Sequence, residues 1–168
     1  MTPAGHGSIV RELPNDLELL ITREFEAPIA LVFDVLTKPE HVDKWFAPRG
    51  EEMTVCSIDL RVGGDYHFVF VTEDGTECSF RGTYLEIEPP TRTVSTWAFD
   101  GWPDVDAVES MDLHEAHGVT TMTSRMTFGD KAARDKMIPS EFDGAQASFE
   151  RMDDHLGSLL DPGRAVSA

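Results

Sequence analysis

The strongest constraint on the fold is a long run of strand patterns in the middle of the chain. From Gly50 to Phe128, apolar and polar residues alternate in short segments, which turn residues such as Glu73-Asp74-Gly75 separate. This spacing is typical of an antiparallel meander. A sheet of this length curls, and its one apolar face needs a cover. The predicted strands are Met53–Leu60, Asp65–Val71, Ser79–Glu88, Thr93–Phe99, Val105–Glu115 and Val119–Phe128.

The segment from Pro139 to Leu160 is long enough to provide this cover. Its apolar residues recur at alternating steps of four and three, which places them on one face of a helix about 33 Å long. Small residues in its first half leave room between the helix and the sheet, and we therefore predict a cavity there. The apolar face consists of Ile138, Phe142, Ala145, Phe149, Met152, Leu156 and Leu159, and the small residues are Gly144, Ala145, Ala147 and Ser148.

Capping signals suggest where this helix begins and ends. Pro139 and Ser140 mark its predicted start, and Gly157 lies near its predicted end. Asp130 is predicted to cap a separate short helix that runs to Met137.

The residues before the meander divide into an arm, a strand and two short helices. Residues 1–16 have little periodicity and are predicted to form a flexible arm. From Leu17 to Phe25 the pattern alternates, with Arg23 on the apolar side, which is typical of a half-buried strand. Pro28 and Pro39 each open a short helix. The predicted organisation is an N-terminal arm (1–16), one α+β domain (17–160) and a C-terminal tail (161–168).

Charge and cysteine content narrow the classes of partner. The formal net charge is −17, from 31 acidic and 14 basic residues in a chain of 168. Because this field repels phosphate backbones and anionic lipid, we expect neither nucleic acid nor a membrane as a partner. Cys56 and Cys78 show no metal-binding spacing, which is typical of a reducing compartment. The sequence also has no signal-peptide pattern, so we expect a cytoplasmic protein.

His114 and His117 come nearest to a metal-binding pattern. On a strand that ends in a turn, these two positions point to opposite faces, and no third ligand is evident. No serine or cysteine lies in a nucleophile elbow either. We therefore predict neither a metal nor a cofactor, and the pattern identifies no catalytic residue.

Polar side chains that alternation can turn inward are the remaining candidates for chemistry. In a deep apolar pocket, a few such groups would orient a ligand by hydrogen bonds. A histidine or aspartate there could also act as an acid or base. Pairing between neighbouring side chains, such as Arg81 with a carboxylate, is the structural alternative. The candidates are His67, Arg81, Thr83, Trp97, Asp112, His114 and Ser124.

Several short strings occur in an order that resembles a known superfamily. They include Ile21-Thr22-Arg23, Trp45-Phe46, Asp59-Leu60-Arg61, Phe80-Arg81-Gly82-Thr83-Tyr84 and Pro89-Pro90. The chain thereby resembles the START-like, or SRPBCC, superfamily, and within it the group homologous to the C-terminal domain of the activator of Hsp90 ATPase. The resemblance implies a helix-grip fold: a curved antiparallel sheet of about six to seven strands that grips a long C-terminal helix, with two short helices after the first strand.

One position departs from this group. Its members often carry Gly-Trp early in the last helix, whereas here Gly144 is followed by Ala145. The smaller side chain implies either a larger pocket or a neighbour that fills the volume. The resemblance implies non-catalytic binding of a small, mainly hydrophobic molecule between helix and sheet. The residues expected to line this site are Tyr66, Phe68, Phe70, Arg81, Trp97, Asp112, His114, Phe142, Ala145, Phe149 and Met152.

The resemblance leaves two other functions open. Similar families include cyclases and hydrolases that use the same pocket, with His67, Arg81, Asp112 or His114 as the acid or base here. The nearest named relative suggests a co-chaperone of Hsp90. That relative carries a separate N-terminal domain important for chaperone binding, and this chain has only the arm of residues 1–16 in its place. Relatives are often dimers, so a homodimer is a further option.

Overall fold

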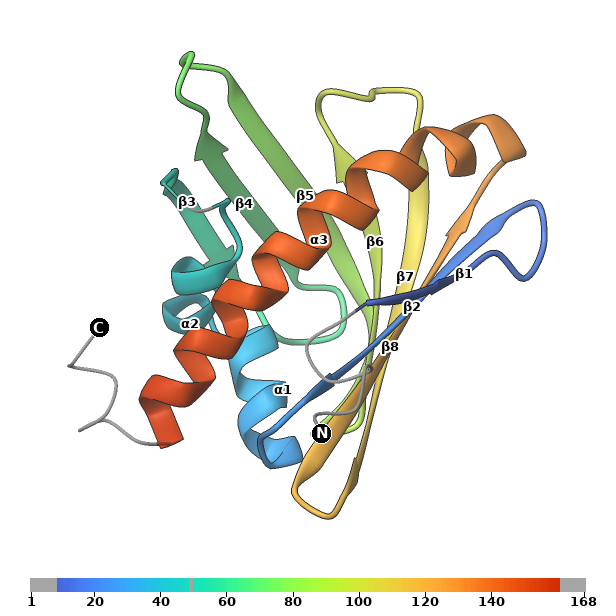
Figure 1. Ribbon diagram of the computed structural model, residues 1–168. Coiled ribbons are helices and arrows are strands. Elements are labelled where there is room, and N and C mark those ends of the chain that lie inside the picture. The colour runs from blue at the N-terminus through green and yellow to red at the C-terminus, as the bar shows by residue number, and fades with distance from the viewer. Residues whose placement is uncertain (1–8, 49, 161–168) are drawn as a thin grey trace.

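The computed structural model describes residues 9–48 and 50–160, without the side chains of residues 139–144. Two short helices follow the second strand, and one long helix follows the last strand (Figure 1). The elements are β1 (Val10–Glu12), β2 (Glu18–Phe25), α1 (Ile29–Thr37), α2 (Pro39–Trp45), β3 (Glu52–Ile58), β4 (Asp65–Val71), β5 (Glu77–Glu88), β6 (Arg92–Phe99), β7 (Asp106–Ala116), β8 (Val119–Phe128) and α3 (Lys131–Leu160).

The strands form one antiparallel sheet in the order β1-β2-β8-β7-β6-β5-β4-β3. The sheet curves behind α3, which crosses it obliquely (Figure 1). The α+β class and the helix-grip arrangement are therefore confirmed. The sheet has eight strands, however, rather than the six to seven expected.

The additional strand lies within the segment predicted to be a flexible arm. β1 pairs with β2, with Val10 opposite Thr22. The preceding residue, Ile9, donates its backbone N–H to the Gln146 side chain of α3 at 3.1 Å. Because all three β1 side chains are exposed, this strand has no buried face to produce an alternating pattern. Its pairing depends on the neighbouring backbone, and the sequence alone could not indicate it.

The inner face of the sheet, which faces α3, is set by β2 and β8. Alternate residues of β2 are buried, and they include Arg23 as predicted. Opposite them, Met122 and Met126 of β8 are also buried. On this face α1 packs near β7 and β8 and α2 near β3, and Trp45 of α2 donates its indole N–H to the Val35 carbonyl of α1 at 2.9 Å. This half of the molecule is a packed core.

α3 is one continuous helix, and its start corrects the sequence prediction. Asp130 accepts a hydrogen bond from the Ala133 backbone N–H at 2.8 Å, so it caps the whole helix rather than a separate short one. The helix continues through position 139, although an interior proline removes one backbone hydrogen bond. The buried Arg134 donates to the Asn15 carbonyl at 2.6 Å. This contact fixes the first turn to the chain before β2.

The second half of α3 is held by polar contacts as well as by burial. Arg23, whose side chain has no exposed surface, donates to both carboxylate oxygens of Asp153, at 2.8 and 2.6 Å. Ser148 donates to the Phe46 carbonyl at 2.9 Å, and Arg151 donates to the Ala47 carbonyl. α3 is therefore attached both to the sheet and to the segment that follows α2.

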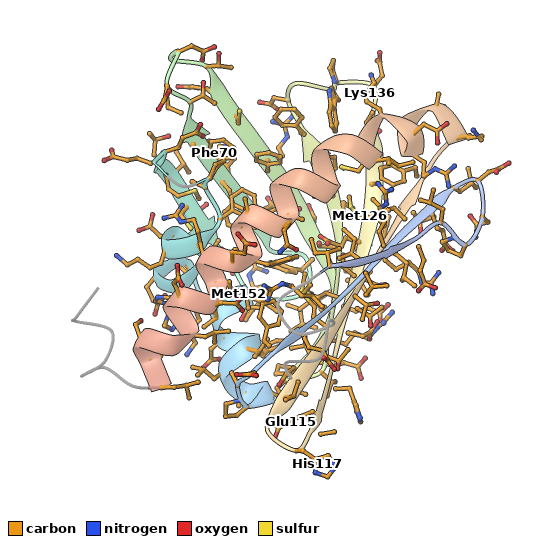
Figure 2. All side chains as sticks on the ribbon, viewed as in Figure 1. Phe70, Glu115, His117, Met126, Lys136 and Met152 are labelled. Carbon is orange, nitrogen blue, oxygen red and sulfur yellow. The ribbon has the colours of Figure 1, made fainter. Side chains whose placement is uncertain are left out.

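Part of the predicted apolar face of α3 is buried. Phe149, Met152 and Leu156 lie in the core. Figure 2 labels Met152 on the helix and Met126 on the sheet, which both belong to this core. Leu159 is 37% exposed, so the buried face ends one turn earlier than predicted. The side chain of Phe142 lies outside the described residues.

We expect Asp153→Asn to lower the free energy of unfolding by about 2 kcal/mol, because it leaves the buried Arg23 charge without its carboxylate. The matched control is Asp34→Asn, which breaks an exposed ion pair with Lys38 at 3.4 Å within α1 and its C-cap. That change should cost less than about 0.5 kcal/mol. Urea unfolding of both variants measures the difference, and equal losses would show that the Arg23 pair does not anchor α3.

A histidine pair joins α2 to the end of α3. His41 Nδ1 and His155 Nε2 are 2.9 Å apart, so one ring must be neutral to accept the hydrogen bond. Burial lowers the pKa of His155, and the charges of His41 and Lys44 lower it further. The folded protein therefore binds fewer protons here than the unfolded chain does, and stability should fall as the pH drops through about 6.5.

His155→Gln should reduce this pH dependence. Between pH 7.5 and pH 5.5, we expect the free energy of unfolding to fall by less in the variant than in the unmodified protein. His114→Gln, at an exposed position of β7, is the control and should preserve the full fall. Parallel curves for all three proteins would contradict the assignment.

Candidate functional site

The centre of the inner face differs from the packed core at β2 and β8. Phe80 of β5, Trp97 and Phe99 of β6, and Met111 of β7 point to the inner face, as the strand register shows. All four side chains keep part of their surface accessible, although Phe80, Trp97 and Met111 pack against the core. We call these four residues the open inner surface. It is an apolar area at mid-sheet that the described residues leave partly uncovered.

The open inner surface is continuous with a series of aromatic contacts. Phe80 stacks on Phe99 with ring centroids 4.7 Å apart, and it meets Trp97 at 6.1 Å. Phe46, which follows α2, contacts Phe80 at 5.3 Å. Trp102 meets Phe99 edge to face at 5.2 Å in the loop after β6. Aromatic rings supply large apolar areas with defined geometry, and these rings support one another.

A row of polar side chains crosses three strands beside this surface. Tyr84 of β5 is paired with Ser95 of β6, and Ser95 is paired with Glu109 of β7. Directly paired residues have Cβ atoms about 5 Å apart and point to the same face. On β8, Ser124 donates its hydroxyl to Glu109 Oε2 at 2.6 Å. Nearby, the Tyr66 hydroxyl donates to the Thr96 carbonyl at 3.0 Å.

Glu109 is the chemically distinctive member of this row. Burial raises the pKa of its carboxyl, and the hydrogen bond from Ser124 only partly opposes the rise. Burial also raises the pKa of both Tyr66 and Tyr84, and the nearby Glu109 charge adds to both shifts. Glu109 nevertheless keeps some accessible surface. It is thus a carboxyl largely surrounded by protein, on a residue that is not fully buried.

The structure brings most of the predicted apolar site residues to the inner face. Tyr66, Phe68 and Phe70 of β4 are buried there, and Phe70 lies on the wing formed by β3 and β4 (Figure 2). Ala145 is partly accessible on α3. Phe149 and Met152 lie in the packed half, where Phe149 meets Phe25 edge to face at 5.8 Å.

Three predicted site residues point to the outer face of the sheet instead of the inner face. Arg81 is paired with Asp100 at 2.8 Å, Asp112 accepts from Arg92 at 2.8 Å, and His114 is exposed. All three lie on the outer face of the sheet, together with His67 and Thr83. The expected inward orientation of these side chains is wrong, because each alternates with apolar residues of its own strand that occupy the inner face.

Glu109 was missed, although the sequence carries the signal that identifies it. Ala107, Met111 and Leu113 alternate with more polar neighbours along β7, and this period places Glu109 on the same side. The same argument on β5 puts Phe80 and Tyr84 inward and Arg81 outward. Reading each strand from its apolar residues gives the phase of both strands correctly.

Other features of the described chain are less suited to a site. A shallow depression of about 400 Å³ lies mainly on the outer face, lined in part by His67, Arg81 and Ala98. Glu115 and His117 lie at the far end of the β7–β8 hairpin (Figure 2).

Residues 9–48 and 50–160 contain no group of three side chains able to hold a metal ion. No helix in this part of the chain is long and apolar enough to cross a bilayer.

Comparison with known proteins places this geometry in a family. The family model described as Activator of Hsp90 ATPase homolog 1-like protein matches residues 26–160. The chain belongs to this family. The match covers every element from α1 to α3, including both the open inner surface and Glu109.

Solved structures support the same fold. A protein from Rhodobacter sphaeroides is 22% identical with a TM-score of 0.85, and the match covers 90% of this chain and 99% of that one. A protein from Arthrobacter aurescens is 22% identical with a TM-score of 0.78, covering 90% and 91%. The AHSA1 protein from Silicibacter pomeroyi is 20% identical with a TM-score of 0.69, covering 84% and 99%. No curated protein matches the chain.

Replacement of Glu109 should stabilise the protein. Because burial raises its pKa, folding disfavours the ionised carboxyl, and this loss of stability grows as the pH rises above about 4.3. Glu109→Gln keeps the shape without the charge, so its melting temperature should exceed that of the unmodified protein at pH 7.5 and approach it at pH 4.5. Glu77→Gln, at an exposed position of β5, should leave the melting temperature nearly unchanged at both pH values.

Proposed function

We propose that the protein binds a small, mainly hydrophobic molecule on the inner face of the sheet, beneath α3, without covalent chemistry. The observation that carries the proposal is the partial accessibility of Phe80, Trp97, Phe99 and Met111 at mid-sheet. Inner-face side chains of β2 and β8 are buried, so this accessibility is local to the centre of the sheet. Ligand sites are typically concave and apolar, with a few placed polar groups.

The position of α3 supports this proposal. Its Cα atoms come within 8 Å of those of β2, β8, α1 and α2, along the packed half of the molecule. The helix carries the small residues Ala133 and Ala145, which pack against the core and are both partly accessible. A small side chain at each position leaves apolar surface available to a bound molecule. The enclosed cavity predicted from the sequence is part of this proposal.

The polar row gives the surface a means of orienting its ligand. Glu109, Ser95 and Tyr84 form a row with the aromatic residues Phe80, Trp97 and Phe99 on one side and Met111 on the other. A ligand with a polar end and an apolar body would therefore bind in one orientation. The shallow depression on the outer face lacks an apolar wall of this kind, since Arg81 and His67 line it.

Ala145→Trp should block binding of an uncharged fluorescent probe. Nile red is expected to gain fluorescence with the unmodified protein, and the variant should weaken its affinity at least about tenfold, because the indole would occupy the space above the open inner surface. The matched control is Ala98→Trp, which introduces the same ring at the depression on the outer face. It should leave the affinity unchanged.

Circular dichroism establishes that both variants are folded, and the intrinsic fluorescence of Trp97 gives a second measurement. Quenching by the probe should decrease in Trp97→Phe if the probe lies on the open inner surface, and the remaining signal comes from Trp45 and Trp102. Loss of binding in Ala98→Trp but not in Ala145→Trp would show that the probe binds the outer face, and it would overturn the proposal.

A further inference from the structure

The polar row at mid-sheet has an excess of hydrogen-bond acceptors. Ser124 occupies Glu109 Oε2, and within the described residues Glu109 forms no other hydrogen bond and no ion pair. The Tyr84 hydroxyl likewise has no hydrogen-bond partner among these residues. Glu109 Oε1 and the Tyr84 hydroxyl oxygen lack a hydrogen-bond partner among the described residues, but neither atom is fully buried. Both oxygens therefore keep some accessible surface.

No cation of the sheet neutralises Glu109. Arg23, which β2 places on the inner face, is bound by Asp153 through two hydrogen bonds on the packed side. The arginines nearest to Glu109 along the sheet, Arg92 and Arg125, point to the outer face and bind Asp112 and Glu18 there. A buried carboxyl is costly unless a partner supplies the opposite charge or the group stays protonated.

We propose that the inner face selects an organic cation, whose apolar body lies on the open inner surface and whose protonated amine binds Glu109, Ser95 and Tyr84. This inference rests on the function proposed above and names the class of ligand. An alkylammonium group has three N–H donors, and the row offers three acceptor groups on adjacent strands. The protonated amine would supply the positive charge that no side chain of the sheet provides to Glu109.

Two further features favour a cation over an anion or a neutral acceptor. The ring of Trp97 adjoins the polar row and continues into the rings of Phe80 and Phe99, and aromatic faces attract ammonium groups. The net charge of −17 raises the local concentration of cations around the protein and lowers that of anions. A ligand that offers only acceptors would need a protonated Glu109 and would receive no help from this field.

Three probes with one aromatic body test the proposal by isothermal titration calorimetry: 2-(2-naphthyl)ethylamine, 2-(2-naphthyl)ethanol and 2-naphthylacetic acid. With the unmodified protein at pH 7.5, we expect the amine to bind at least about tenfold more tightly than the alcohol, and the acid more weakly than both, because hydrogen bonds to a charged group are stronger than those between neutral groups. Glu109→Gln should bring the amine to the affinity of the alcohol and leave the alcohol unchanged.

The control for general charge attraction is Glu77→Gln, which removes one exposed carboxylate of β5 and should preserve the preference for the amine. Tyr84→Phe should weaken the amine by a smaller factor than Glu109→Gln. Lowering the pH towards 5 should weaken the amine but not the alcohol, because protons compete with the amine for Glu109.

The possible failures are distinguishable. If the alcohol or the acid binds as tightly as the amine, or if Glu109→Gln keeps the preference, the selection of cations is wrong while hydrophobic binding stands. If Nile red binds the inner face and all three naphthyl probes fail, the selection of cations is again wrong. If Nile red also fails to bind, both the proposed function and the selection of cations are wrong.

Discussion

The attachment of α3 is the constraint on which the rest of the structure depends. A single helix covers the inner face, and its second half is held by the two hydrogen bonds between Arg23 and Asp153. Withdrawing an arginine from water is unfavourable unless its charge is matched, so the pair favours one position of the helix over others that burial alone would permit. The rings of Phe25 and Phe149 flank the guanidinium, at 4.7 and 5.9 Å from its central carbon. Polar matching and aromatic packing therefore act at the same place.

This attachment explains why the two halves of the inner face differ. Polar contacts hold α3 against β2 and the segment after α2, and Arg134 holds its first turn near Asn15. These points lie along β2 and beside α2, which packs near β3 at the other edge of the sheet. The aromatic residues of β5 and β6, between these edges, have no equivalent polar contact with α3 among the described residues. The surface of Phe80 and Trp97 remains partly accessible as a result. The same geometry that stabilises the packed half thus exposes the half proposed to bind a ligand.

Much of this arrangement could be predicted from the sequence, because strand alternation and proline positions are local signals. The strand of Arg23, the two short helices and the cap at Asp130 follow from neighbouring residues alone. β1 could not be predicted, because its pairing depends on the backbone of β2 rather than on a face of its own. The continuity of α3 through position 139 depends on contacts such as that of Arg134, which outweigh the local effect of a proline.

The candidate site shows a different limit of sequence reasoning. The apolar residues of β4 and β6 were placed correctly, since aromatic side chains at every second position have one natural face. Asp112 and His114 have the chemistry of a site, but the phase set by Ala107 and Leu113 places both on the outer face. Glu109 is unfavourable by the ordinary rules of a core, because a carboxyl among aromatic rings opposes folding when it is ionised. A residue that breaks a local rule in an otherwise consistent strand is therefore the place to look for function, and here that residue adjoins the part of the inner face that remains accessible.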